Sequence, residues 1–178
     1  MVAEIWTIGH STRPIADFVA ALEANAIKLV ADVRLLPGSR CYPQFNQDAL
    51  TESLGKFGIN YVHLPELGGR RRPRNDSHNT AWRNEAFRGY ADYMETEPFR
   101  AGMERLLGLA EQSGRTAIMC AEALWWRCHR SLIADFLKVR GTEVKHIVHD
   151  GGTEAHPFTS AARLIDGELD YRGTKDQR

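Results

Sequence analysis

Short apolar runs alternate with helical patterns along most of the chain. The apolar runs have the length of strands and few polar interruptions, which is typical of strands that are buried on both faces. They lie at residues 4–8, 28–33, 60–64, 116–120 and 143–148. Between them, apolar residues three and four positions apart predict amphipathic helices. The first predicted helix begins near Pro14. The other four cover about residues 46–57, 85–95, 99–112 and 129–139.

Residues with strong turn or capping preferences support these boundaries. Pro14 suits the first turn of a helix, where its missing N–H has no partner to lose. Asn46 is expected to cap the second helix at its start, and Gly58 follows the end of that helix. Asp166-Gly167 lies between two short apolar segments, which predicts a β-hairpin.

Strands separated by helices imply β–α–β crossovers and therefore a mostly parallel sheet. We expect one α/β domain over residues 1–178, built as a three-layer sandwich of about five strands with helices on both faces. The polar stretch 65–84 is expected to be a long loop, and 150–178 a short C-terminal extension. The pattern does not determine the order of the strands.

Composition narrows the class of protein. The 178 residues include 23 Lys and Arg and 23 Asp and Glu, so the formal net charge is zero. This balance argues against a whole-protein electrostatic surface for nucleic acid or membrane. The chain shows no apolar run of the roughly 18–20 residues that cross a bilayer, and its first residues lack the pattern of a signal peptide. Because three cysteines do not make a disulfide framework, we expect a cytoplasmic globular protein.

Reactive side chains follow three of the predicted strands. The first strand leads into Gly9–Arg13, the second into Asp32–Arg34, and the fourth into Cys120–Glu122, which Trp125–Arg130 follows. The carboxyl ends of parallel strands share one edge of a sheet, where ligands of α/β proteins bind. If the strand order allows these segments to converge, they form a site.

Two of the cysteines are candidates for a nucleophile. Cys120 ends a buried strand and Cys128 begins a helix, where the helix terminus and nearby cations lower the pKa of a thiol. Either could attack a substrate, with His129 or His10 exchanging protons and Glu122 orienting the histidine or acting as acid or base. The structural alternative is that both cysteines are small buried hydrophobic residues.

The arginines near these strand ends suggest an anionic ligand. Arg34 and Arg130, with His10 and Ser11, are candidates to bind a phosphate or carboxylate. Each has a structural alternative: Arg34 could pair with Asp32, and Arg130 with a carboxylate such as Glu122. His10 could be a satisfied polar residue at a strand end, and Ser11 could cap a helix. Arg130 stands in the first turn of a helix, where a cation opposes the helix dipole, and such a conflict often marks a functional position.

The same side chains admit other chemistry. Cys120, Cys128, His129 and His10 could hold zinc, although their spacing is not an ordinary zinc pattern. Cys120 and Cys128 could be a redox pair, although such pairs usually have two intervening residues. The chain has no glycine-rich dinucleotide motif and no phosphate-loop signature, so we expect no cofactor and assign no metal. The later histidines have no spacing that indicates a site.

A basic run in the long loop makes nucleic acid an alternative partner. Arginines at four of five positions could neutralise phosphates, and Trp82 in the same loop could stack on a base or cover a pocket. A solvated loop is the structural alternative. The four residues are Arg70, Arg71, Arg72 and Arg74.

In their order along the chain, several of these blocks resemble the domain of unknown function 488 family. The resemblance spans about residues 5–147 and implies an α/β fold and a site at the marked positions, without naming a reaction. Between the cysteines, where the family usually has charged or small residues, this chain has Leu124-Trp125-Trp126. The blocks are Thr7–Ser11, Asp32–Arg34 with Pro37, Ser39 and Phe45, Leu67–Gly69, and Cys120–Glu122 with Cys128–Arg130.

These observations predict an enzyme with an anion-recognising site of cysteine, histidine and arginine at the carboxyl edge of the sheet. We expect a cysteine-dependent hydrolase or transferase that acts on a phosphate- or carboxylate-bearing, nucleotide-like substrate. The alternatives are a binding module for nucleic acid or a small anion, without turnover, and a metal-binding protein.

Overall fold

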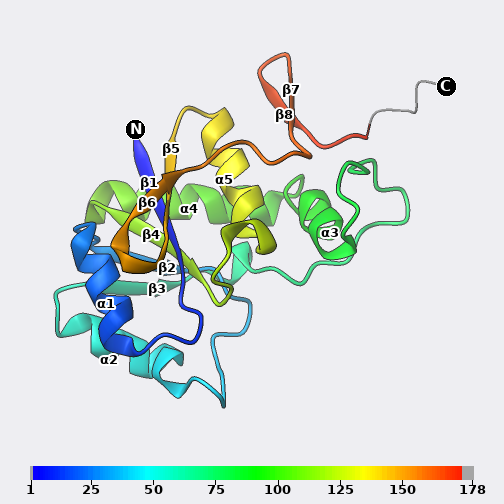
Figure 1. Ribbon diagram of the computed structural model, residues 1–178. Helices are drawn as coiled ribbons and strands as arrows, with labels where there is room; N and C mark the ends of the chain where they lie inside the picture. Colours follow the sequence, from blue (N-terminus) through cyan, green and yellow to red (C-terminus); the bar gives the residue numbers. More distant parts are fainter. Residues whose placement is uncertain (1, 174–178) are drawn as a thin grey trace.

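The computed structural model, which describes residues 2–173, is built around a six-stranded sheet (Figure 1). Strands β1 to β5 are parallel, β6 runs antiparallel to β5, and the order is β3-β2-β4-β1-β5-β6. The predicted α/β class and mostly parallel sheet are confirmed. The strands are β1 (Glu4–Gly9), β2 (Leu29–Asp32), β3 (Asn60–His63), β4 (Thr116–Cys120), β5 (Glu143–Ile147) and β6 (Thr153–Ala155).

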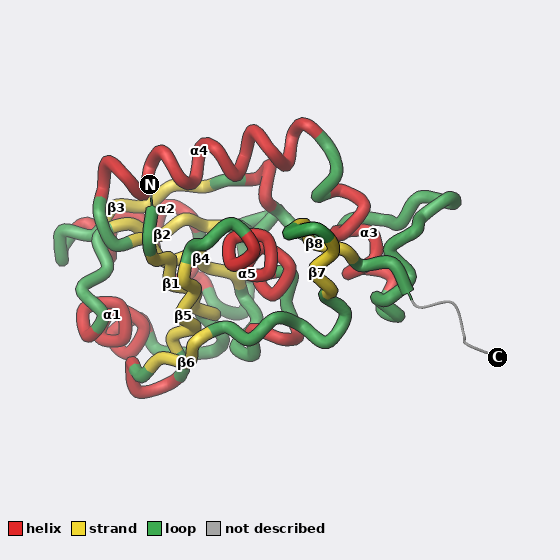
Figure 2. The backbone as a smooth tube through the Cα atoms, turned by 90° about the horizontal axis from the view of Figure 1, so that it is seen from above, coloured by secondary structure: helices red, strands yellow, loops and turns green. Residues whose placement is uncertain are grey.

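Five α-helices cover the two faces of this sheet among the described residues. Apolar side chains of α1 and α2 pack on one face, and those of α3, α4 and α5 pack on the other. Figure 2 shows α1 and α4 on opposite sides of the strands. The helices are α1 (Ile15–Ala24), α2 (Gln47–Gly55), α3 (Glu85–Tyr93), α4 (Glu97–Ser113) and α5 (Arg130–Val139).

Alternation along the strands divides the core into two layers. In β1, Ile5 packs with α3, α4 and α5, whereas Trp6 and Ile8 pack with α1 and α2. Successive side chains of a strand point to opposite faces, so one apolar run serves both layers. Every residue of the central strands β2 and β4 is buried, as their sequences predict.

Two helix-start predictions differ from the structure. Pro14 occupies the position before α1 rather than its first turn. Asn46 does precede α2, but its side chain accepts a hydrogen bond from the backbone N–H of Ser39 instead of capping the helix. Ser11 does not cap α1 either, because it lies in a turn with φ of 51° three residues before Pro14. By contrast, Asn84 accepts from two N–H groups of α3, a cap that we did not predict.

The loops hold four short 3-10 helices within the described range. The predicted long loop contains η2, and the segment between the two candidate cysteines contains η3. They are η1 (Pro43–Phe45), η2 (Pro65–Leu67), η3 (Trp125–Arg127) and η4 (His149–Gly151).

The C-terminal extension adds the edge strand β6 and a separate hairpin. The hairpin pairs β7 (Arg163–Ile165) with β8 (Glu168–Asp170) around Asp166-Gly167, whose φ values of 51° and 77° fit a tight two-residue turn. The hairpin prediction is therefore confirmed, whereas β6 was not predicted. The last five residues of the predicted extension lie outside the described residues. Within residues 2–173, no helix is both long and apolar enough to cross a membrane.

Candidate active site

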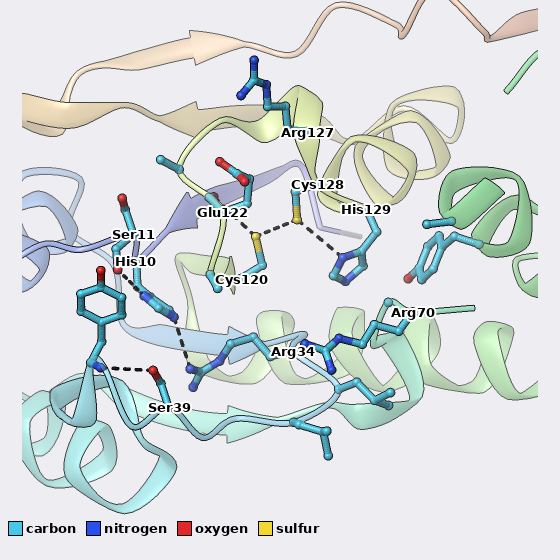
Figure 3. Close-up of a pocket in the computed structure, with 18 of the residues that line it drawn as sticks. His10, Ser11, Arg34, Ser39, Arg70, Cys120, Glu122, Arg127, Cys128 and His129 are labelled. Atoms are coloured by element: carbon cyan, nitrogen blue, oxygen red, sulfur yellow. Dashed lines mark hydrogen bonds between the residues drawn. The ribbon is translucent and has the colours of Figure 1, made fainter. Parts of the chain in front are cut away.

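The predicted strand ends converge on one cavity of about 570 Å³ (Figure 3). Because β4 lies between β1 and β2, the segments after all three strands reach the same edge of the sheet. The cavity is lined by seven of the eight predicted site residues. These are His10, Ser11, Arg34, Cys120, Glu122, Cys128 and His129.

Two thiols lie in contact in the wall of this cavity. Cys120 ends β4, Cys128 precedes α5, and their Sγ atoms are 2.7 Å apart (Figure 3). Cys128 Sγ is also 3.5 Å from His129 Nδ1 and accepts a hydrogen bond from the backbone N–H of Arg130 at 3.5 Å. Several groups that stabilise a negative sulfur thus surround Cys128.

The ring of His129 is oriented by a backbone carbonyl. Its Nε2 lies 3.0 Å from the carbonyl oxygen of Val33, which can only accept, so Nε2 carries a proton. The other nitrogen, Nδ1, therefore exchanges a proton with Cys128. Gly69 leaves room for the ring, because a Cβ at that position would lie 3.0 Å from Nδ1. Tyr90 packs on the ring at a centroid distance of 5.0 Å.

These surroundings shift the two thiol pKa values in opposite directions. Burial opposes ionisation of Cys128, yet the hydrogen bond from Cys120 and the neighbouring His129 and Arg130 lower the pKa of Cys128 well below its ordinary value. Burial raises the pKa of Cys120 well above its ordinary value, and the contact with Cys128 adds to this. Cys120 is therefore the thiol that stays protonated and donates, and Cys128 is the one that ionises.

Arg130 lies behind the thiols and does not line the cavity. Its side chain is 1% exposed. Nη2 donates to the backbone carbonyls of Glu122 at 2.6 Å and Ala123 at 3.3 Å, and Nη1 donates to Thr7 Oγ1 at 3.1 Å. The structure thus shows neither the expected ligand-facing position nor a pairing with the Glu122 carboxylate. Arg130 holds the loop between the two cysteines against β1.

Arg34 lies on the floor of the cavity, and most of its N–H groups already donate to protein acceptors. Nε and Nη2 form a forked pair with the Asp32 carboxylate, the shortest distance being 2.7 Å, and Nη2 also donates to the carbonyl of Phe45 at 2.8 Å. Nη1 lies 3.3 Å from His10 Nε2. Among the described partners, this leaves one Nη1 hydrogen for a ligand. The expected pairing with Asp32 and a contact to a ligand are thus compatible.

His10 supports Arg34 and is not in contact with either thiol. Its Nδ1 lies 2.8 Å from the carbonyl of Ser11, so Nδ1 donates and Nε2 accepts from Arg34. The ring stacks on Phe45 at 4.3 Å. Burial lowers the pKa of His10, and the charge of Arg34 acts in the same direction. His10 is therefore a neutral acceptor that orients the arginine.

The turn after β1 packs directly on the loop after β4. The backbone N–H of Ser11 donates to the carbonyl of Ala121 at 2.9 Å. Gly9 is required at this contact, since a Cβ there would lie 1.9 Å from the carbonyl oxygen of Glu122. The Glu122 carboxylate is exposed and accepts from the N–H of Leu124 at 3.3 Å. It does not reach His129, so the orienting role expected of Glu122 falls to the carbonyl of Val33.

The basic run is split between the cavity and the protein surface. Arg70, with φ of 60°, lines the cavity and extends toward Arg34 (Figure 3). Arg71 stacks on the ring of Tyr93 at 3.8 Å, and Arg74 pairs with Glu95 at 3.0 Å. Of the four arginines, Arg70 is therefore the one that contributes to the cavity.

Several site groups had no signal in the sequence analysis. The carbonyl of Val33 has no side-chain signature, and Tyr90 looked like an ordinary apolar position of a helix. Gly69 was part of the family resemblance, but its role depends on a tertiary contact with His129. Trp82, for which stacking on a base or covering a pocket was one reading, packs edge-on against Phe87 at 5.2 Å. Within residues 2–173, no group of three or more His, Cys, Asp or Glu side chains is placed to hold a metal ion.

Comparison with known proteins identifies the family. The model of the domain of unknown function DUF488 matches residues 14–137, which is more than half of the chain. The chain belongs to this family. The DUF488 match includes Arg34 and the segment from Cys120 to Arg130, and excludes His10 and Ser11. The comparisons with curated proteins and with solved structures gave no match. Since the DUF488 description names no reaction, function has to be argued from the site.

Proposed function

We propose that this DUF488 protein is a cysteine-dependent hydrolase or transferase for a small anionic substrate, with Cys128 as the nucleophile. The observation that carries the proposal is the position of Cys128 in the cavity wall. Its sulfur meets the thiol of Cys120, the imidazole of His129 and the first amide of α5. A buried structural cysteine needs none of these groups, whereas each of them stabilises a thiolate.

The geometry supports a two-step transfer. The Cys128 thiolate attacks the electrophilic carbon or phosphorus of the substrate, a bond to sulfur forms, and the bond to the leaving group breaks. His129 Nδ1 gives the leaving group its proton. Water or an acceptor alcohol then loses a proton to Nδ1 and displaces the thiolate. The Val33 carbonyl keeps the proton on Nε2, so each transfer uses the nitrogen that faces Cys128.

The charge balance of the cavity favours an anionic substrate. The charge of Arg34 is offset by Asp32 beneath it. No ion pair to a carboxylate is found for Arg70 among residues 2–173, and Arg127 and the exposed Glu122 also line the cavity. Arg70 extends toward Arg34 in Figure 3, and the two could hold a phosphate or carboxylate between them through the remaining N–H of Arg34.

Two alkylating probes of different charge test this proposal. Iodoacetate carries a carboxylate and iodoacetamide does not, so the ratio of their rates at Cys128 measures anion recognition. The experiment uses a Cys41→Ser background, because Cys41 is exposed. Arg70→Ala should lower the ratio by about fivefold, or about 1 kcal/mol, the effect of one partly exposed ion pair. Arg72→Ala is the matched control, since Arg72 is exposed in the same loop and does not line the cavity.

Two results would contradict the proposal. Equal ratios in the Arg70 and Arg72 variants would remove the case for anion recognition in this cavity. Modification of Cys120 in preference to Cys128, located by peptide mass spectrometry, would overturn the assignment of the nucleophile.

The contact between the thiols also favours a second candidate, thiol–disulfide exchange. The Cys128 thiolate would attack one sulfur of a small disulfide and release its other half as a thiolate. Cys120 would pass its proton to that thiolate and attack Cys128 Sγ, which releases the second half and leaves a Cys120–Cys128 disulfide. The Sγ separation of 2.7 Å supports this candidate, because a resolving thiol has to lie next to the attacking one.

Oxidised glutathione distinguishes this candidate in the same Cys41→Ser background. Exchange predicts loss of two hydrogens from the intact protein, and Cys120→Ser should stop the reaction at a mixed disulfide on Cys128. Failure of Cys120→Ser to accumulate that adduct would exclude exchange and leave the transfer mechanism standing.

A further inference from the structure

Five buried side chains form a continuous chain of hydrogen bonds behind the thiols. Arg130 Nη1 donates to Thr7 Oγ1 at 3.1 Å, and Thr7 Oγ1 lies 2.6 Å from His146 Nδ1. His146 Nε2 lies 2.8 Å from His156 Nδ1, and His156 Nε2 lies 2.8 Å from Asp135 Oδ1. Each of the five is 3% exposed or less, and the cavity reaches none of them.

The chemistry of the groups fixes the direction of every hydrogen bond in this chain. A guanidinium can only donate, so Thr7 Oγ1 accepts from Arg130 and its own hydrogen is free for His146 Nδ1. His146 then carries its proton on Nε2 and donates to His156 Nδ1. His156 in turn carries its proton on Nε2 and donates to Asp135. The opposite order would leave the Thr7 hydroxyl hydrogen without an acceptor among the described residues.

Charges at the two ends hold this order in place. Asp135 also accepts from the hydroxyls of Tyr171 at 2.7 Å and Thr159 at 2.5 Å, so hydrogen bonds satisfy its carboxylate. Burial lowers the pKa of His146 to about 2, and the neighbouring His156 and Arg130 act in the same direction. A second cation of α5 lies beside His156: Lys138 Nζ donates to the backbone carbonyl of His156 at 2.8 Å.

These five hydrogen-bonded side chains support the loop between the cysteines at two points. Thr7 fixes Arg130, whose other nitrogen binds the carbonyls that follow Cys120. The ring of His146 also stacks face to face on Trp125 of η3, with centroids 4.4 Å apart and planes 5° apart. The Arg130 Nε has no partner, so the acceptor supplied by Thr7 is needed to hold this buried guanidinium.

We infer that Thr7, His146, His156 and Asp135 form a positioning relay that holds Arg130 against the two thiols. The spacing of the two histidines indicated no site in the sequence, and both lie outside the range of the DUF488 match. This inference rests on the proposed function, because holding Arg130 beside the thiols matters for the reaction only if Cys128 acts as a thiolate. The relay consists of positioning residues, since none of them touches the cavity.

Substitution of Thr7 tests the relay through the thiolate it supports. Thr7→Val keeps the volume and removes the acceptor for Arg130, whereas Thr7→Ser keeps the hydroxyl. In the Cys41→Ser background, Thr7→Val should lower the rate of Cys128 alkylation by iodoacetamide at pH 7 about tenfold and move its pH profile upward. Thr7→Ser should stay within about twofold of the parent. A folded Thr7→Val protein with the parent profile would overturn the relay.

Nitrogen-15 NMR of histidine-labelled parent protein tests the relay without any variant. Both His146 and His156 should show the Nε2–H tautomer at pH 7, and His146 should remain neutral at pH 5. A Nδ1–H tautomer at either ring, or a charged His146 at pH 5, would overturn the proton order. A normal pH profile of Cys128 in the parent protein would instead refute the proposed function, so the two failures are distinguishable.

Discussion

At the scale of single residues, the two thiols show how position decides chemistry. Cys120 and Cys128 are the same residue type and are in contact, yet Cys128 alone meets His129 and the first amide of α5. The sequence left open which thiol is the candidate nucleophile, because the group that orients His129 is the carbonyl of Val33, ninety-six positions away. No local pattern contains that contact.

The first residue-scale prediction concerns the donor role of Cys120. Cys120→Ala should raise the pKa of Cys128, because it removes the S–H group that donates to the thiolate. Cys120→Ser, which keeps a donor, should raise it less. The pH dependence of Cys128 alkylation measures both shifts. Identical profiles for the alanine and serine variants would show that the thiol contact does not stabilise the charge.

A second prediction concerns the buried pair on the cavity floor. Asp32→Asn should lower the free energy of unfolding by about 3–5 kcal/mol, since Arg34 would remain charged and buried without a counterion. The double variant Asp32→Leu with Arg34→Met should cost less than Asp32→Asn alone. Urea unfolding of the parent protein and the two variants tests this; a double variant at least as unstable as Asp32→Asn would contradict it.

At the scale of elements, the site depends on β1 meeting the loop that follows β4. Gly9→Ala would place a Cβ 1.9 Å from the carbonyl oxygen of Glu122, which Arg130 holds in place. The backbone must move, so we expect a loss of at least about 2 kcal/mol in stability and slower alkylation of Cys128. Gly38→Ala is the control, because nothing lies within 4 Å of its added Cβ. Equal unfolding midpoints for the two variants would contradict the close contact.

The elements themselves were largely predictable. The five apolar runs became β1 to β5 and the five helical patterns became α1 to α5, because burial on both faces leaves a strong pattern in each. The edge strand β6 was missed because its three residues are all exposed, so it has no apolar signal. Caps were less predictable: Asn46 precedes α2, but a tertiary contact with Ser39 takes its side chain away from the helix.

At the scale of the whole molecule, the site draws on parts of the chain that its motifs do not contain. The sequence placed most of the site correctly at one sheet edge, since parallel strands end together. It could not place Arg130 behind the thiols, because that depends on carbonyls of the loop and on Thr7 of β1. It also could not connect His146 with His156, whose contact is made when β5 and the segment after β6 pack against α5.

The buried histidines predict how the stability of the whole protein depends on pH. Since the folded pKa of His146 is about 2 and that of a free histidine is about 6.5, the unfolded chain binds more protons between these values. Stability is therefore complete above about pH 6.5 and falls as the pH falls below it. Near pH 5–6, His146 therefore contributes about 1 kcal/mol per pH unit to this fall.

His146→Gln should reduce the slope of the free energy of unfolding against pH by about 1 kcal/mol per pH unit. His149→Gln, a control at an exposed position, should leave this slope unchanged. Urea unfolding at pH 7, 6 and 5 gives the slopes. Parallel slopes for the parent protein and His146→Gln would show that His146 is not held neutral in the folded state.

The central claim, that Cys128 is an activated nucleophile, is tested most directly by the pH dependence of its alkylation. Iodoacetamide reacts with the thiolate, and peptide mass spectrometry assigns each modification to Cys128 or Cys120. We expect Cys128 to titrate well below the free-thiol value of about 8.5, with Cys120 unmodified over the same range. A Cys128 that titrates at or above about 8.5, or a Cys120 that reacts first, would contradict the account.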